Sequence, residues 1–329
     1  MKPAASPENA GAASATAVPP RPETSAARGF TPAQRRQFAF ITVGALAVFA
    51  LIRWLPTGTN LNHMDFRVDA KNPIDFCDPL NPQFIPVVAV ASPVSLTLSD
   101  VTGAVAGEET QATLTLRTAS GKPIAPADLV VTHTELLHLL IADPTLTDYQ
   151  HVHPRPAAAP GAWTFRFTPR RAGAYRIFAD FTPVATNRGL YANTDLTVAG
   201  GAGPVPAPAT NTWAVERDGY RFALVPAALP LRVNQVVDLK FVGQRHDGGR
   251  VPLEPVMGAF AHLVAFDAER SGFAHLHPME LDVTQPPDAL KPVLNFKITF
   301  PRPGRYVIWA QIDLGGTETF LPYWFDVAG

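Results

Sequence analysis

The sequence has little cysteine and little charge. Its 329 residues include a single cysteine, which excludes a disulfide-stapled domain, a cysteine-rich zinc module and an iron–sulfur protein. Only 17% of the residues are charged, and 27 Lys and Arg nearly balance 28 Asp and Glu. This balance gives no support to a nucleic-acid-binding surface, so we expect no nucleic acid partner. The 34 prolines argue against long helices, whereas 47% apolar residues suffice to form a core.

One apolar segment near the N-terminus is a candidate transmembrane helix. Residues 38–52 carry no charge, and as a helix they span about 22 Å, which reaches across a bilayer core if Arg53 snorkels and Trp54 lies at the interface. Five basic residues oppose two acidic ones before this segment, which places the N-terminus in the cytoplasm. We therefore predict a disordered cytoplasmic tail (1–34) and a single-pass transmembrane anchor helix (35–55).

Two other interpretations of this segment stay open. A cleaved signal peptide is the first, but the 37 residues before the apolar run are many for such a signal, and no A-x-A-like cleavage site follows. A buried helix of a soluble protein is the second. The uncleaved signal-anchor is the interpretation that we adopt, and it puts the remainder of the chain outside the cytoplasm, in the periplasm or at the cell surface.

The remainder of the chain has the pattern of a β protein. Residues 56–93, rich in Asn, Asp and Pro, are expected to be a stalk or an extended segment that packs onto the first domain. Short alternating apolar runs separated by turn residues then fill 94–199 and 212–329. The linker between them, 200–211, is rich in Gly, Pro and Ala. Seven or eight short strands in about 110 residues predict a mainly β fold with two tandem immunoglobulin-like β-sandwich domains.

The two halves are repeats of each other. At an offset of 124 residues, a histidine, an acidic turn and an H-x-H-P sequence occur in both halves. Gly-x-Tyr sequences at Tyr175 and Tyr306 also recur and resemble the tyrosine corner of immunoglobulin-like domains, in which the hydroxyl bonds back to the backbone. Six of the nine histidines lie in the repeated segments; they are His138, His151, His153, His262, His275 and His277.

In each repeat the three histidines have the spacing of a metal site. If the first segment is a hairpin centred between Pro144 and Thr145, His138 lies opposite His151, and His153 projects from the same face. Three imidazoles could then converge on one ion and leave a coordination position open. Histidine-only ligation favours copper or zinc, with nickel a third choice. The alternative is that the histidines are structural and hydrogen-bond backbone carbonyls at a sheet edge.

Further residues near the triplets are candidates for supporting roles. His133 and Met257 occupy equivalent positions of the two repeats and both residue types bind copper, although their odd spacing from the strand histidines puts them on the other face of an unbroken strand. Met279, which follows the second H-x-H-P, is a third additional ligand candidate. Asp143 and Asp267 begin the predicted turns and are expected to cap them. The alternative for both is to accept a hydrogen bond from a ligand imidazole.

The first repeat resembles a known class of bacterial domains. Residues 137–183 read LHLLIADPTLTDYQHVHPRPAAAPGAWTFRFTPRRAGAYRIFADFTP. This pattern is similar to the YtkA-like class of small extracytoplasmic β-sandwich domains, and the second half is a looser version in which Trp-Ala-Gln replaces Phe-Ala-Asp. The resemblance implies heavy-metal or copper handling, with His138, His151 and His153 as the matched positions.

These observations predict a membrane-anchored extracytoplasmic protein that binds copper or zinc for metal buffering, resistance or delivery to a partner protein. The alternative function is a structural or adhesion module of tandem immunoglobulin-like domains without metal. A metalloenzyme is the third class, but H-E-x-x-H, serine nucleophile motifs and paired catalytic carboxylates do not stand out, so an enzyme is not expected.

Overall fold

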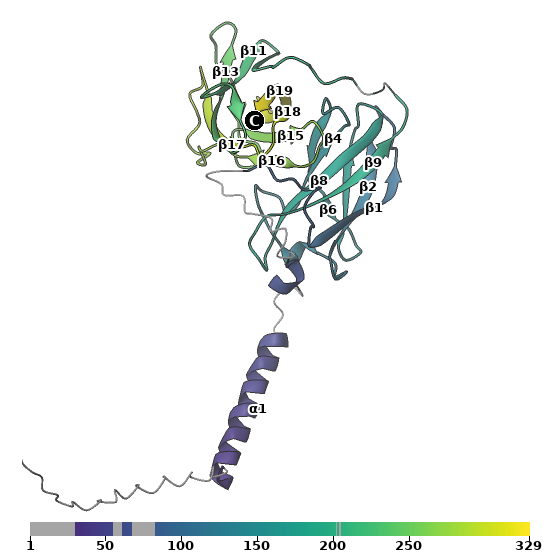
Figure 1. Cartoon of the computed structure of the whole chain (residues 1–329), viewed down its shortest axis with the longest axis vertical. Coiled ribbons are helices and arrows are strands. Elements are labelled where there is room, and N and C mark those ends of the chain that lie inside the picture. The colour runs from purple at the N-terminus through teal and green to yellow at the C-terminus, as the bar shows by residue number, and fades with distance from the viewer. Residues whose placement is uncertain (1–29, 55–60, 68–82, 202, 204) are drawn as a thin grey trace, which may run out of the picture. The chain divides into compact units, whose positions relative to one another are not determined.

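The computed structural model describes residues 30–54, 61–67, 83–201, 203 and 205–329 (Figure 1). The helical segment and the β domains form two separate compact units. Most of the predicted tail and parts of the predicted stalk, Cys77 included, lie outside the described residues.

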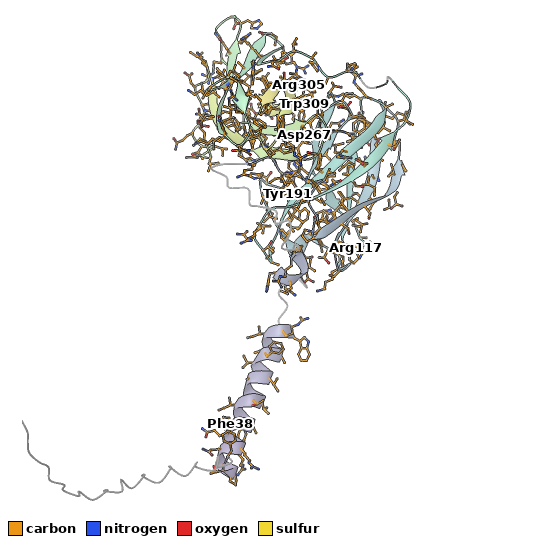
Figure 2. The ribbon with its side chains drawn as sticks, in the orientation of Figure 1. Phe38, Arg117, Tyr191, Asp267, Arg305 and Trp309 are labelled. Carbon is orange, nitrogen blue, oxygen red and sulfur yellow. The ribbon has the colours of Figure 1, made fainter. Side chains whose placement is uncertain are left out.

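The N-terminal apolar segment is helix α1 (Pro32–Trp54). The side chain of Thr31 accepts a hydrogen bond from the Gln34 backbone, and the Gln34 side chain accepts one from the Thr31 backbone, so a capping box begins the helix. Its side chains, Phe38 among them, are not buried (Figure 2). Helix α1 has 23 residues, and an 18-residue window within it has a mean hydropathy of 1.7, so α1 is consistent with a single-pass anchor. Its orientation stays a prediction.

The first β domain consists of two sheets that enclose a core. One sheet has the order β1-β2-β7-β6; in the other, β5, β4, β8 and β9 lie side by side and β3 also pairs with β8. The strands are β1 (Val94–Thr102), β2 (Thr110–Thr118), β3 (Leu129–Val130), β4 (His138–Ala142), β5 (Tyr149–Val152), β6 (Arg155–Pro156), β7 (Ala162–Phe167), β8 (Gly173–Pro183) and β9 (Leu190–Val198).

The second β domain repeats this arrangement. Its sheets have the orders β10-β11-β13-β17 and β12-β19-β18-β15-β16, and β14 pairs with β18. The strands are β10 (Ala214–Arg217), β11 (Tyr220–Pro226), β12 (Leu231–Arg232), β13 (Val236–Arg245), β14 (Leu253–Glu254), β15 (His262–Asp267), β16 (Phe273–Leu276), β17 (Val293–Thr299), β18 (Gly304–Leu314) and β19 (Glu318–Ala328). The prediction of a mainly β fold with two repeated domains and one N-terminal apolar helix is confirmed.

Strands β4 and β15 are buried on both faces. In β4, Leu139 and Ile141 point into the core of the first domain, whereas Leu140 and Ala142 point the opposite way. The outward residues belong to a separate core between the two domains, formed by the β5-β4-β8-β9 and β16-β15-β18-β19 sheets. Its residues include Leu140, Ala142, Leu146, Tyr149, Phe178, Tyr191, Val264, Phe266, Phe273, Val307, Trp309 and Trp324. Burying each large side chain contributes about 1.5–3 kcal/mol, so the two sheets form a stable contact.

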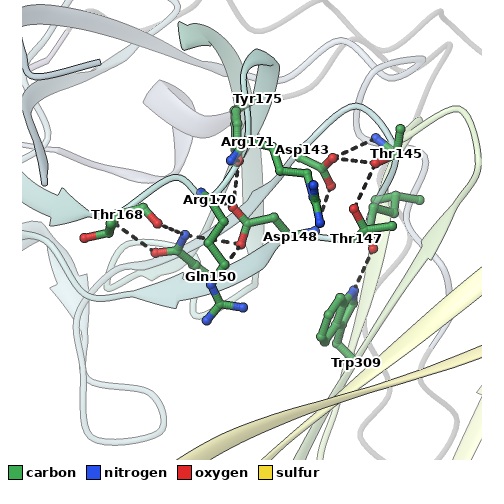
Figure 3. A network of polar contacts seen from close by, with 11 residues as sticks. Asp143, Thr145, Thr147, Asp148, Gln150, Thr168, Arg170, Arg171, Tyr175 and Trp309 are labelled. Atoms are coloured by element: carbon green, nitrogen blue, oxygen red, sulfur yellow. Dashed lines mark hydrogen bonds and ion pairs between the residues drawn. The ribbon is translucent and has the colours of Figure 1, made fainter. Parts of the chain in front are cut away.

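Hydrogen bonds across the domain interface add to this apolar contact. The Trp309 indole donates to the Leu146 carbonyl at 3.2 Å (Figure 3). Arg176 donates to the Arg270 carbonyl at 2.9 Å, and Arg270 donates to the Ala174 carbonyl at 2.7 Å. The acceptors are backbone carbonyls, whose positions are set by the fold of each domain. These hydrogen bonds therefore fix the relative position of the two sheets and also stabilise the interface.

The segments between α1 and the first domain pack on both domains. Phe66 is buried in the first core, and Asp65 forms an ion pair with Lys122 at 2.6 Å. Phe84, in contrast, lies in the core of the second domain, and Ile85 bonds to the backbone of Phe273. The expectation that this stretch packs onto the first domain therefore describes residues 61–67 but not residues 83–85.

Candidate metal centre

Both hairpins that carry the histidines have a register different from the expected one. The prediction that His138 lies opposite His151 is wrong, because Leu140 is the partner of His151 and the register brings His153 level with His138. The cause is the turn, where Leu146 takes a positive φ of 59° and lengthens the loop. The shift amounts to two residues and thus leaves all three histidines on one face. In the second repeat Leu263 pairs with Leu276, which gives the same shift.

The turn aspartates have a structural role. The Asp143 carboxylate accepts hydrogen bonds from the backbone of Thr145 and Asp148 (Figure 3). Asp267 accepts from the backbone and hydroxyl of Ser271. The expected capping role is confirmed, and these contacts make it unnecessary to assign either carboxylate to a ligand imidazole.

The first triad, His138, His151 and His153, has nitrogens that face each other. His138 Nε2 donates to the Thr132 carbonyl at 2.9 Å, and His151 Nδ1 donates to Gln311 Oε1 at 2.8 Å. The remaining nitrogens, His138 Nδ1 and His151 Nε2, lie 3.1 Å apart. His153 Nε2 is buried and has no hydrogen-bond partner among the described residues.

The second triad, His262, His275 and His277, repeats this geometry. His262 Nε2 donates to the Val256 carbonyl at 3.0 Å, and His275 Nδ1 donates to Asp180 Oδ2 at 3.1 Å. His262 Nδ1, His275 Nε2 and His277 Nε2 are buried and have no hydrogen-bond partner among the described residues. In each triad, one candidate ligand atom from every histidine lies within 4.8 Å of the others.

These unpaired nitrogens fit a metal ion. A buried acceptor without a partner costs about 1–3 kcal/mol, and each triad gathers several. When neutral, His138 Nδ1 and His151 Nε2 both present lone pairs to each other at 3.1 Å, close to the roughly 3.3 Å between two nitrogens of a tetrahedral site with metal–nitrogen distances of about 2.0–2.1 Å. The triads could therefore hold metal ions, and the metal is not identified.

Burial keeps five of the six triad imidazoles neutral. It lowers the pKa of His153 to about 4 and that of His262 to about 3. Burial and the neighbouring imidazoles together lower the pKa values of His151, His275 and His277 well below the usual range. Near neutral pH these histidines therefore offer lone pairs to a metal without first losing a proton.

The two triads are in contact with each other. The ring centroids of His151 and His275 are 5.4 Å apart and those of His138 and His275 are 5.8 Å apart, similar to the 5.3 Å between His138 and His151. His133, from the turn after β3, stacks on His277 with ring centroids 3.6 Å apart. We call the two triads and His133 the seven-histidine cluster; it lies where the two domains meet.

The three additional ligand candidates have different surroundings. His133 and Met257 have positive φ angles of 49° and 48° in equivalent tight turns, so the face expected for an unbroken strand does not apply. His133 stacks on the triad of the opposite repeat and also meets His138 of its own triad edge-on, with ring centroids 6.1 Å apart. Met257 is half-buried. Met279 is 52% exposed and lines a cavity of about 380 Å³ beside His275 and His277.

Sequence reasoning missed Asp180 and Gln311, the acceptors for His275 and His151. They occupy equivalent positions in β8 and β18, the last residues of the Phe-Ala-Asp and Trp-Ala-Gln sequences. The signal in the sequence that could have identified them is a single polar residue within an otherwise apolar strand.

The fold and this site define a class: two-domain β-sandwich proteins in which each domain contributes a buried histidine triad to the domain interface. The chain belongs to the family described as a domain of unknown function, DUF8832, whose model matches residues 89–199 and again residues 214–329. No curated protein matches the sequence.

Several solved structures are distantly similar. A protein of Corynebacterium diphtheriae titled as membrane anchored is 9% identical with a TM-score of 0.21, over 73% of this chain and 59% of that one. A DUF4785 family protein from Legionella pneumophila is 8% identical with a TM-score of 0.22, over 70% and 55%. Alpha-2-macroglobulin from Escherichia coli is 12% identical with a TM-score of 0.23, over 79% and 17%. Scores this low support no statement about function, and the resemblance to the YtkA-like class is not confirmed.

Proposed function

We propose that the protein is a membrane-anchored, extracytoplasmic metal-binding protein with one three-histidine site per repeat, acting in metal buffering, resistance or delivery to a partner protein. The observation that carries this proposal is the convergence of buried imidazole nitrogens that no donor in the described part of the chain binds. A purely architectural histidine would use both nitrogens or expose the second one to water.

Copper is the first choice of metal. Imidazole ligands suit both copper and zinc, and Cu²⁺ has the highest affinity in the divalent series. Met279, which lines the same cavity as His275 and His277, adds soft sulfur beside the second triad. A site that accepts both sulfur and imidazole can handle both oxidation states of copper.

Anchoring by α1 would keep this metal-binding unit close to the extracytoplasmic surface of the membrane. Arg35 and Arg36 at the start of the helix support an N-terminus in the cytoplasm. A periplasm-only reporter fused to the C-terminus should be active, and an inactive fusion would overturn the orientation.

Metal analysis of the detergent-solubilised full chain tests the proposal. We expect two copper or zinc ions per chain, falling to one when His138, His151 and His153 are changed to alanine and again to one when His262, His275 and His277 are changed instead. His246→Ala is the matched control, because this exposed histidine lies outside the cluster and contacts Glu216. A chain that stays metal-free at micromolar copper and zinc would contradict the proposal and leave the structural module as the function.

A further inference from the structure

Hydrogen bonds from the seven-histidine cluster to neighbouring polar residues cross the domain interface. In the second domain, Gln311 of β18 is the register partner of His262. Its side-chain oxygen nevertheless accepts from His151 of the first domain, at 2.8 Å. The Gln311 amide nitrogen donates to Glu318, which leaves the oxygen directed at His151. The second domain therefore orients a ring of the first triad.

The reverse contact comes from the first domain. Asp180 of β8 is the register partner of His138, yet its carboxylate accepts from His275 of the second domain, at 3.1 Å. Both acceptors are fixed by strand pairing in one domain and bond to the middle histidine of the other. The two hydrogen bonds therefore occupy equivalent positions, one from each domain to the other.

We propose that the cluster binds two metal ions as one pair, in which each domain orients the central ligand of the other domain's site. The inference rests on the proposed metal-binding function and adds how the two sites depend on each other. A hydrogen bond to one imidazole nitrogen selects the tautomer and ring orientation that present the other nitrogen to the metal. Gln311 and Asp180 are accordingly positioning residues for His151 and His275.

The geometry also places the two ions close together. The His151 and His275 rings belong to different triads, and their centroids are 5.4 Å apart. With metal–nitrogen distances of about 2.0–2.1 Å, the two ions are within roughly 12 Å of each other even in the most extended arrangement. Two paramagnetic ions at such a separation broaden each other's spectra through dipolar coupling.

Electron paramagnetic resonance of the full chain tests the pairing. Loaded with two equivalents of Cu²⁺, the wild-type protein should give a dipolar-broadened spectrum, whereas each single-triad variant with one equivalent should give a narrower one. Two bound ions without broadening would overturn the pair while leaving the proposed function intact. Absence of bound copper and zinc would overturn both.

Affinity measurements test the crossed dependence. In the chain whose second triad is changed to alanine, Gln311→Leu should weaken the remaining first site by about 10–100-fold, and Asp180→Ala should change it little. In the chain whose first triad is removed, Asp180→Ala should weaken the second site by about the same factor and Gln311→Leu should not. If each acceptor affects only the triad of its own domain, or both triads equally, the inference is wrong.

Conservative variants separate orientation from folding. Asp180→Asn keeps an oxygen acceptor and should retain most of the affinity that Asp180→Ala loses. If Gln311→Leu fails to fold by circular dichroism, Gln311→Asn withdraws the amide by one methylene and should produce the same selective loss at the first site. The dipolar broadening in the electron paramagnetic resonance spectrum of the wild-type protein tests the metal pair even if neither Gln311 variant folds.

Discussion

The two repeats have equivalent strands but different side chains around their triads. The middle imidazole of the first triad is held by a neutral amide, Gln311, whereas that of the second is held by a carboxylate, Asp180. The turn position that carries His133 in the first repeat carries Met257 in the second. A carboxylate acceptor raises the basicity of a ligand imidazole more than an amide does. The repeats therefore provide two matched sites with unequal electronic environments.

Access differs as well. His275 and His277 of the second triad line the cavity of about 380 Å³ together with Met279, and no residue of the first triad lines it. In the first triad, the middle imidazole bonds to Gln311, which is fully buried. The last histidine of each triad, His153 or His277, is half-buried in both repeats, so the cavity is what distinguishes the second site. This comparison teaches that one copy of a duplicated site can gain a neighbouring cavity while the candidate ligands stay the same.

The largest expected effect is that acid lowers the free energy of unfolding of the metal-free protein, and that the two triads contribute unequally to this loss. Burial lowers the pKa of His153 to about 4 and that of His262 to about 3, whereas in the unfolded chain both titrate near 6.5. Below about pH 6.5 the unfolded chain takes up protons that the folded one does not, so the free energy of unfolding falls as the pH decreases towards 4 and is at its full value above 6.5.

Denaturant unfolding at pH 5 and pH 7.5 measures this dependence. Alanine variants of the second triad should flatten it more than those of the first, because the shift of His262 is larger than that of His153. His63→Ala changes an exposed histidine outside the cluster and is the control. Equal stability of the wild-type protein at both pH values would contradict the prediction.

The tyrosine corners should differ in stability by a smaller amount. The Tyr175 hydroxyl donates to the buried Asp148 carboxylate at 2.6 Å (Figure 3), whereas Tyr306 donates to the Arg302 carbonyl at 3.0 Å. Hydrogen bonds to charged groups contribute about 1.5–3 kcal/mol and neutral ones about 0.5–1.5 kcal/mol. Tyr175→Phe should therefore destabilise more than Tyr306→Phe in thermal or urea unfolding; equal losses would mean that the corners are equivalent.

The sequence was sufficient to predict the two β domains and the histidines that gather in them. Alternation along the strands and a repeated turn are local signals, and together they place His138, His151 and His153 on one face without knowledge of the register. The register itself could not be predicted, because it depends on Leu146 and Arg270, two non-glycine residues with positive φ. Few sequence features identify such positions.

The convergence of the two triads could not be predicted either. The apolar runs of β4 and β15 are typical of strands buried on both faces, but nothing local says that the second face is covered by the other repeat. The acceptors are also distant in sequence: Gln311 is 160 residues from His151, and Asp180 is 95 residues from His275. Such pairs arise only when two folded domains meet.

Metal exchange should be faster at the second site. With single-triad variants loaded with copper, a soluble chelator should remove the ion from the second site about tenfold faster than from the first, which corresponds to about 1.4 kcal/mol in the barrier. The cavity beside His275 and His277 gives the chelator a route to the ion. Stopped-flow absorbance measures the two rates, and equal rates would show that the cavity does not control access.

The smallest expected effect is that of changing His133, and its size shows whether the His133 ring positions His277 or binds the metal directly. Its ring stacks on His277 with an interplanar angle of 19°, so it restrains that ring, and aromatic pairs of this kind contribute about 0.5–1.5 kcal/mol. His133→Ala should weaken the second site by roughly two- to tenfold and affect the first site less, because His133 meets His138 only edge-on, at 6.1 Å. Met257→Ala should leave the second site unchanged. A loss of affinity well beyond that range in a competition titration would instead make His133 a direct ligand, in which case the two sites would differ in coordination number as well as in access.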